Sequence, residues 1–196
     1  PSLFPQVAST GTALLLRDTS TGTERVLPGA ARRIACFATS AHSVTPLVAY
    51  AESGGLDPKI HVHAVDSLER VTTLDGCAHL GITALAFSRD GQFLAVASVN
   101  PDRKLSLINH RTGEVLVTTS LPSEAAQVVF DPFDSHRLLV THKRGGVFAV
   151  HPGVTLQVVS EIFHRRSVTQ RPLLVDAAGV KPSALTAAAW TPNDTI

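Results

Sequence analysis

The sequence predicts an all-β fold, because apolar residues recur with a period of two and short turn signals interrupt them. Residues 82–98 show this pattern most clearly. Their first strand is expected to divide its side chains between two faces, with Ile82, Ala84 and Ala86 on one and Leu85 and Phe87 on the other. A helix would not keep this alternation, so the stretch predicts a β-strand.

A tight turn and a second strand follow. Asp90 and Gly91 suit the turn, since Asp hydrogen-bonds its own backbone and Gly reaches positive φ without a Cβ clash. Residues 93–97 are apolar on both faces, which is typical of a strand covered by packing on either side. Residues 82–98 therefore predict a β-hairpin that lies inside a larger assembly of sheets.

The hairpin is repeated along the chain. If Phe87 marks the end of an inner strand, similar positions are Phe37, Phe130 and Trp190, at intervals of 50, 43 and 60 residues. A four-stranded propeller blade takes about 40–50 residues, and an insert would stretch the last interval. The repeats predict part of a β-propeller, with about three full blades and parts of two more.

Each repeat supplies further strands in the same order. Second strands are expected at 47–51, 93–98 and 137–141, third strands at 59–64, 103–108 and 146–150, and outer strands at 71–74, 115–119 and 156–159. Strands at 13–17 and 24–27 belong to an earlier blade. After Phe37 a longer loop, residues 38–45, replaces the tight turn.

The expected divisions are the end of a first blade at 1–28, blades at 29–75, 76–120 and 121–160, an inter-blade loop at 161–183, and the start of another blade at 184–196. The pattern lapses between 162 and 182, where prolines argue against a ladder strand because proline cannot donate a hydrogen bond. Four basic residues of this loop are candidate partner contacts: His164, Arg165, Arg166 and Arg171.

Residues 74–113 resemble a WD repeat. The usual Gly-His before the inner strand is degenerate here, as Gly76-Cys77-Ala78-His79. The usual Trp-Asp at the end of the third strand is replaced by Ala64-Val65, Ile108-Asn109 and Ala149-Val150. The resemblance implies a WD40-type propeller.

Among WD-repeat proteins, the chain resembles the cilia- and flagella-associated members of the motile axoneme. The segments that carry this resemblance are 47–51 with 57–63, 101–108, and 163–167 leading to 190–192. The resemblance implies a non-catalytic scaffold of the ciliary or flagellar axoneme, in a tether complex that links inner-arm dynein f to doublet microtubules and regulates motility. Its partners would be a paralogous WD-repeat tether subunit, inner-arm dynein and the doublet microtubule. The alternative is a cytosolic WD-repeat adaptor in another assembly.

Composition disfavours other partner classes. A net charge of +1, with 17% charged and 5% aromatic residues, gives no bias toward nucleic acid or a membrane surface. No apolar run approaches the roughly 18 residues of a membrane span. Cys36 and Cys77 match no metal spacing and are expected to be buried free thiols. Basic pairs such as Arg32-Arg33 and Lys143-Arg144 are expected in solvated loops.

No catalytic, cofactor-binding or metal-binding residue is predicted. His61 and His63 share a strand face and could chelate a metal with His79 or Asp75, but a structural site needs four ligands and a packing or solvated role is favoured. Glycine pairs at 54–55 and 145–146 lack the Lys-Ser/Thr of a phosphate loop and predict tight turns. No Gly-x-Ser-x-Gly elbow accompanies the serines, so neither catalysis nor a small-molecule substrate is expected.

Overall fold

The computed structural model describes residues 5–30, 32–40, 45–131, 138–143, 147–151 and 169–172. Every regular element in these ranges is a β-strand, as the sequence predicts. Because no described element is helical, this part of the chain has no helix of the length and apolarity that a membrane span requires.

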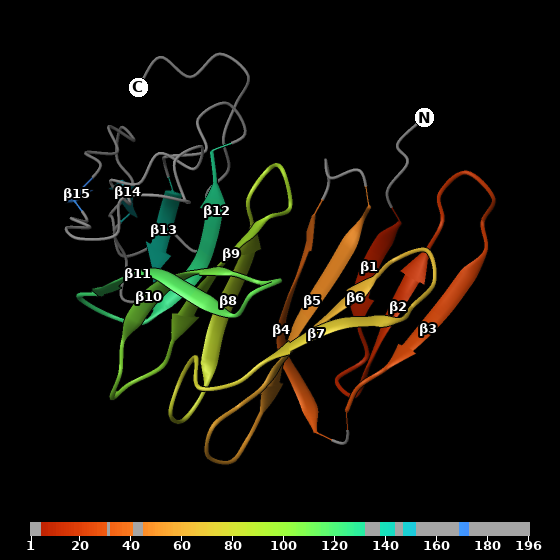
Figure 1. The fold of residues 1–196 in the computed structure, drawn as a ribbon, viewed down its shortest axis with the longest axis horizontal. Coiled ribbons are helices and arrows are strands. Elements are labelled where there is room, and N and C mark those ends of the chain that lie inside the picture. Colours follow the sequence, from red (N-terminus) through yellow and green to blue (C-terminus); the bar gives the residue numbers. More distant parts are fainter. Residues whose placement is uncertain are drawn as a thin grey trace, which may run out of the picture.

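The strands form four antiparallel sheets that follow one another along the chain (Figure 1). The first sheet holds β1 (Gln6–Ser9), β2 (Ala13–Arg17) and β3 (Glu24–Pro28). The second holds β4 (Arg33–Ser40), β5 (Leu47–Ser53), β6 (Ile60–Ala64) and β7 (Arg70–Leu74). The third holds β8 (Ile82–Phe87), β9 (Phe93–Ser98), β10 (Lys104–Asn109) and β11 (Glu114–Ser120). The fourth holds β12 (Ala125–Phe130), β13 (Leu138–His142), β14 (Val147–His151) and β15 (Thr169–Pro172).

The arrangement is that of a partial WD40-type β-propeller. Within each four-stranded sheet the spatial order of the strands is their order in sequence. The first strands of successive sheets, β4, β8 and β12, are neighbours, so they lie at the inner side of the arc. A four-stranded sheet cannot cover both of its own faces, and neighbouring blades therefore bury one another. Strand β1, which the sequence analysis missed, is short and mostly exposed.

Apolar side chains fill three interfaces between consecutive blades. The first interface, between the first and second sheets, includes Leu14, Leu16, Val48 and Tyr50. The second interface, between the second and third sheets, includes Ala49, Val62, Phe87, Leu94 and Val96. The third interface, between the third and fourth sheets, includes Phe93, Ala95, Phe130 and Val140. Strand β9 thus contributes to two interfaces by simple alternation, which confirms the prediction that both of its faces are covered.

The predicted faces of β8 are wrong at Ile82, because the strand contains a β-bulge. Ile82 pairs with Ser98 and Ala84 with Ala97, so the register shifts between them. Ile82 consequently packs in the second interface with Leu85 and Phe87, not beside Ala84 in the third. The same irregularity recurs at the start of β4 and of β12. One extra residue breaks the period of two, and strict alternation cannot anticipate it.

The predicted turn after β8 is confirmed in detail. The N–H of Gly91 donates to the carbonyl of Ser88 at 2.9 Å, and Gly91 has φ +71°. The Asp90 carboxylate accepts the N–H of Gln92 at 3.0 Å. The buried His110 side chain contacts this turn, with its Nε2 atom 2.8 Å from the Gly91 carbonyl oxygen. Because that oxygen can only accept, Nε2 carries the proton.

The second blade departs from the predicted hairpin at Phe37. Strand β4 does not end there but continues to Ser40, and Thr39 pairs with Val48 as Phe87 pairs with Leu94. Phe37 lies on the same face as expected, yet two residues earlier in the strand. The aromatic was therefore a good marker of the face and a poor marker of the strand end.

The missing Trp-Asp has a structural substitute. In the turn after β10, Asn109 Oδ1 accepts the N–H of Arg111 at 3.1 Å, and the N–H of Gly113 donates to the Asn109 carbonyl at 2.9 Å. Asp18 does the same after β2, where the hydroxyl and N–H of Ser20 lower the pKa of its carboxyl to about 2. A short side chain that accepts hydrogen bonds is what this turn needs, and Asn supplies it as Asp does.

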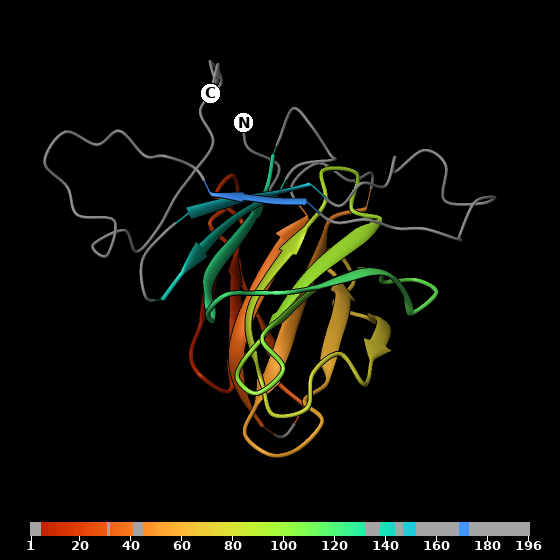
Figure 2. The same ribbon diagram turned by 90° about the vertical axis from the view of Figure 1, so that its left-hand side faces the viewer.

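Part of the predicted loop at 162–182 is a strand, the outer strand of the fourth sheet. Residues 169–172 form β15, which pairs antiparallel with β14, and Figure 2 shows it in blue beside that sheet. Pro172 pairs opposite Phe148 at the end of β15, and β15 is the edge strand of its sheet, a position in which sheets accept proline. The expected outer strand at 156–159 lies outside the described residues.

Candidate interaction surface

One end of the blades gathers connections from several sheets. In an antiparallel sheet the connections alternate ends, so the loop between second and third strands shares an end with the loop that leads to the next blade. Four such connections, 54–59, 75–81, 99–103 and 121–124, make up what we call the β5–β6 face. Loops on a rigid scaffold are where binding residues concentrate.

Three of these loops are joined by a clamp centred on His79. The N–H of Asp57 donates to the His79 carbonyl at 2.9 Å, and the Asp57 carboxylate lies 3.6 Å from His79 Nδ1. The N–H of His79 donates to the Asp102 carboxylate at 2.7 Å. Asp57 has φ +51°, a left-handed conformation that L-residues rarely adopt. The clamp thus fixes loops of two adjacent blades at the cost of some backbone strain.

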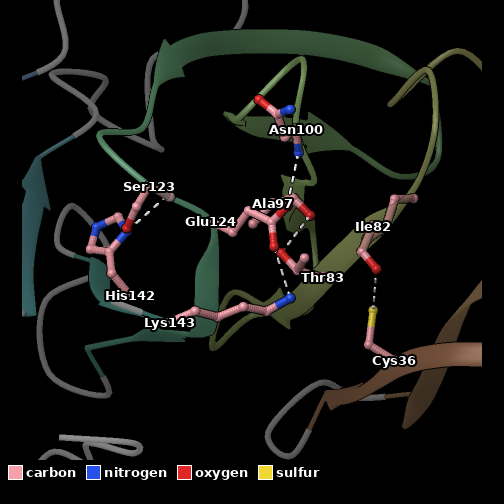
Figure 3. A network of polar contacts seen from close by, with 9 residues as sticks. All are labelled: Cys36, Ile82, Thr83, Ala97, Asn100, Ser123, Glu124, His142 and Lys143. Atoms are coloured by element: carbon pink, nitrogen blue, oxygen red, sulfur yellow. Dashed lines mark hydrogen bonds and ion pairs between the residues drawn. The ribbon is translucent and has the colours of Figure 1, made fainter. Parts of the chain in front are cut away.

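Glu124 links the third and fourth blades on the same face (Figure 3). Its carboxylate accepts the N–H of Asn100 at 3.1 Å and lies 2.9 Å from the Lys143 ammonium. The Lys143 N–H also donates to the Glu124 carbonyl at 2.9 Å. Beside this contact is a hollow of about 430 Å³, lined by Asn100, Arg103, Ser123, Glu124 and Lys143. Lys143, predicted to be a solvated base, is exposed but paired.

The two cysteines are free and partly buried. Cys36 Sγ points to the carbonyl of Ile82 across the second interface at 3.9 Å (Figure 3). Burial raises the pKa of the Cys36 thiol to about 12, and burial followed by the nearby Asp75 charge raises that of Cys77 to about 11. A thiol with a raised pKa is a poor nucleophile, so both cysteines serve as packing residues.

His61 and His63 lie in the first interface, which supports the predicted packing role. The Tyr50 ring stacks on the His63 ring, with 5.8 Å between the ring centroids, and is tilted against the His61 ring, with 5.1 Å between the centroids. His61 bridges Glu52 and Thr73, at 3.1 and 3.2 Å. The two further metal ligands considered are engaged elsewhere, since Asp75 lies 3.7 Å from Lys59 and His79 belongs to the clamp. The described residues contain no group of three His, Cys, Asp or Glu side chains with metal-binding geometry.

The remaining sequence candidates have separate outcomes. Gly54 and Gly55 have φ +79° and +94°, which confirms the predicted tight turn, and the Arg32 guanidinium donates to the Gly54 carbonyl at 2.8 Å. His164, Arg165 and Arg166 lie outside the described residues. Arg171, expected in a loop, lies in β15 and pairs with Ala149.

The exposed leucines of the β5–β6 face were not predicted from the sequence. Leu56 is 62% exposed and Leu80 is 43% exposed. Each stands next to a turn-forming residue, Leu56 before Asp57-Pro58 and Leu80 before Gly81. The available signal was a leucine within a run of turn-forming residues. Such a leucine belongs to no periodic strand pattern and is therefore expected to be exposed in a loop.

Sequence comparison extends these observations. No family model matches the chain. A curated relative, cilia- and flagella-associated protein 43 of Chlamydomonas reinhardtii, is 30% identical over 179 residues, covering 71% of this chain and 10% of the relative. The chain belongs to the family of cilia- and flagella-associated protein 43. The sequence pattern at 163–167 leading to Trp190 is interpreted as a resemblance to protein forty-three, with proteins forty-four and fifty-seven as runners-up, and the curated relative agrees with the first. The chain spans about a tenth of the length of the relative that it matches.

Proposed function

We propose that this propeller segment belongs to a non-catalytic scaffold of the cilium or flagellum. The observation that carries the proposal is the 30% identity to cilia- and flagella-associated protein 43 across 71% of the chain. The structure is compatible with a scaffold, because the described residues build an arc of packed blades, and polar contacts join connecting loops of adjacent blades. Such loops are suited to binding other proteins.

The finer proposal is an axonemal tether. On the family resemblance, the full-length protein would join a paralogous WD-repeat subunit and link inner-arm dynein f to doublet microtubules, thereby regulating motility. The basic residues His164, Arg165, Arg166 and Arg171 are the proposed contact to an acidic partner surface such as a tubulin tail. Opposite charges at a surface strengthen association in a salt-dependent way.

Localisation of the tagged full-length protein tests this function. We expect the protein along the axoneme, and we expect its removal to reduce inner-arm dynein density in averaged electron tomograms and to change the beat. A protein that stays diffuse in the cytoplasm of cells whose cilia beat normally without it would favour the alternative, a general WD-repeat adaptor of another assembly.

Charge substitution tests the proposed contact segment. Replacing Arg165 and Arg166 by Glu should weaken co-sedimentation of the full-length protein with axonemal doublets, most strongly at low salt. A control with the same charge change replaces Arg89 and Arg111 by Glu, two exposed arginines in the turns after β8 and β10. Equal loss in both variants would show a general charge effect and would count against a specific contact.

A further inference from the structure

The first blade has one strand fewer than the other blades. Its sheet holds β1, β2 and β3, whereas each of the other three sheets holds four strands. In the turn after β2, the N–H of Gly22 donates to the Asp18 carbonyl at 2.9 Å. The N–H of Gly113 makes the same contact with the Asn109 carbonyl in the turn after β10, which is a third strand. Strands β1, β2 and β3 therefore correspond to a second, a third and a fourth strand, and none of the described residues forms the inner strand of this blade.

The contacts of Thr10 support this correspondence independently. The Thr10 hydroxyl donates to the carbonyl of Ala13 at 3.1 Å and accepts the N–H of the same residue at 3.2 Å. In the third blade the Ser98 hydroxyl makes the same two contacts with Lys104, at 3.4 and 2.9 Å. Ala13 and Lys104 each begin a third strand. Thr10 thus occupies the position of Ser98, which lies opposite the bulge of an inner strand.

Burial separates Thr10 from the equivalent residues of the other blades. Glu52, Ser98 and His142 pair with inner strands and are 6%, 1% and 1% exposed. Thr10 is exposed. The local contacts of Thr10 and Ser98 are the same, so the difference in burial comes from the inner strand that covers Ser98 and that no described residues supply to Thr10.

The backbone of β1 has a free edge on the side where the inner strand belongs. Strand β1 pairs with β2, and no other strand in the described part of the chain pairs with it. The Thr10 N–H donates to the Ala13 carbonyl, so this pair is a hydrogen-bonded pair of the ladder. Such pairs alternate in antiparallel sheets, so Val7 and Ser9 direct their N–H and C=O groups away from β2. An edge of this kind accepts a further strand through main-chain hydrogen bonds.

Apolar side chains of β4 are left partly uncovered at the same place. Ile34 pairs with Glu52 at the bulge of β4 and so has the position that Ile82 has in β8. Ile82 is 3% exposed, with β4 packed beside β8. Ile34 and Phe37 pack against the first interface but are only half-buried. A strand beside β4 would complete their burial, which favours an occupant with apolar side chains on that face.

We propose that in the full-length protein the free edge of β1 holds the inner strand of the first blade. The strand is an extended segment of the same polypeptide, from outside the described residues, and runs antiparallel to β1. Its backbone pairs with Val7 and Ser9, its bulge lies opposite Thr10, and its alternate apolar side chains cover Ile34 and Phe37. This pairing goes beyond the proposed scaffold function, because it does not depend on where the protein is localised.

The same polypeptide is the favoured source of the strand. The inner strands β4, β8 and β12 all come from the chain whose blades they complete. The stretch that the curated relative shares with this chain is 10% of the relative, so a protein of this family has ample sequence from which the strand can come. A tethered segment also has a high effective concentration at the edge, which a separate protein lacks.

Hydrogen exchange at residue resolution in the full-length protein tests whether the edge is occupied. The amides of Val7 and Ser9 should exchange at least about a hundredfold more slowly than in an unstructured peptide, because a paired strand opens only rarely. The outer strand β7, which pairs with β6 alone among the described strands, provides the comparison, since its outward amides should exchange fast. Exchange of Val7 and Ser9 as fast as that of the outward β7 amides would overturn the proposal.

Proline at the edge gives a second test. Val7→Pro removes an N–H that β2 does not use, so it should matter only if another strand accepts that N–H. We expect the Ser9 amide to exchange at least about tenfold faster in this variant, while β2 and β3 keep their protection. Val7→Ala is the matched control, because it loses the same packing and keeps the N–H. Equal exchange of Ser9 in the two variants would contradict a paired edge.

Cross-linking identifies the occupant. A photoreactive residue in place of Ala8, which is exposed, should react with the adjacent strand, whose side chains lie about 5 Å away. Mass spectrometry of an equal mixture of isotopically light and heavy full-length protein should show only light–light and heavy–heavy products. The same residue at the exposed Val71 of β7 should give no such product. Mixed light–heavy products would indicate a second copy, and a product with another protein would indicate a separate partner. Either result would overturn the assignment to the same polypeptide.

Discussion

The first and second interfaces are built on the same backbone register and differ in chemistry. At matched positions the second blade presents Val48, Tyr50, His61 and His63 to its neighbour, whereas the third blade presents Leu94, Val96, Ser106 and Ile108. The first interface therefore contains stacked and hydrogen-bonded rings, and the second is filled almost entirely by aliphatic side chains. Blade packing depends on shape and alternation, and polar residues are accepted where each finds a partner.

A second difference lies opposite the bulges at the start of β4, β8 and β12. Three buried polar residues occupy equivalent positions there, Glu52, Ser98 and His142, each less than 7% exposed. Ser98 bonds the Lys104 backbone, whereas Glu52 bonds the His61 ring. The identity of the residue at this position sets how each interface responds to substitution.

The largest expected effect is the loss of aliphatic volume in the second interface. Leu94→Ala should lower the free energy of local opening by about 2–5 kcal/mol, because Leu94 is fully buried and its removal leaves a cavity. Hydrogen exchange of β9 and β10 in the full-length protein measures this opening. The matched change Val48→Ala in the first interface should cost less, since fewer methyl groups are lost. A larger cost for Val48→Ala would contradict the expectation that aliphatic volume matters more in the second interface than in the first.

The first interface should lose stability when one partner of its buried hydrogen bonds is removed. Glu52→Ala leaves the buried His61 Nε2 without its carboxylate and should cost about 1–3 kcal/mol. Glu52→Gln keeps an acceptor oxygen and should retain most of the protection of β5 and β6 against exchange. Equal protection in the wild type and in Glu52→Ala would mean that the contact contributes nothing to blade packing.

Acid should loosen the first interface through His63. Burial lowers the pKa of His63, against the raising effect of the Leu68 carbonyl, and the charges of His61 and Arg70 lower it further. The folded pKa therefore lies below the ordinary value near 6.5, and the unfolded chain binds more protons as the pH falls through that value. This contribution to stability is complete above about pH 6.5 and declines below it.

A variant isolates that contribution. His63→Phe keeps the stacking on Tyr50 and removes the titrating ring. The exchange of β5 and β6, corrected for intrinsic rates, should depend less on pH between 7 and 5 in the variant, while peptides from β9 keep their wild-type behaviour. An unchanged pH dependence of β5 and β6 would assign the acid response to other groups, such as His110 and His142, whose pKa values burial also lowers.

The smallest expected effect compares two equivalent hydrogen bonds. Thr73 contacts His61 at 3.2 Å, and Thr118 contacts Ser106 at 3.0 Å, at the same register position in adjacent blades. Thr73→Val and Thr118→Val should each cost roughly 0.5–1.5 kcal/mol, measured by hydrogen exchange of β7 and β11. Thr73→Val should be the more costly, because the larger His61 ring cannot turn to another partner as the Ser106 hydroxyl can. The opposite order would show that the histidine network is adaptable.

Much of the blade architecture could be predicted because it depends on local patterns. The hairpin at Asp90 and Gly91, the two covered faces of β9 and the order of strands follow from alternation and turn chemistry. The strand bounds were mostly within one or two residues. The errors arose where one residue breaks a pattern, as at the bulge beside Ile82, or where a strand recurs after a long connection, as at β15.

The candidate surface could not be predicted in the same way. Leu56 and Leu80 are 24 residues apart in the sequence and become neighbours through one hydrogen bond between loops of adjacent blades. No periodic signal connects such residues, because their proximity depends on how two blades are placed relative to each other. Basic clusters are visible in sequence, whereas the hydrogen bond that joins these two loops is visible only in three dimensions.

The β-strand period, the turns and the repeat follow from the sequence, since these arise from the chirality and side-chain preferences of neighbouring residues. Which polar residues are buried with partners, and which loops are clamped together, depends on the packing of the blades. Glu52 and His61 show the difference. Nothing in the sequence marks this carboxylate and this imidazole, nine positions apart, as buried partners, and they become so only when two blades pack together. Desolvation and pairing are properties of packed blades, and the chain acquires them only on folding.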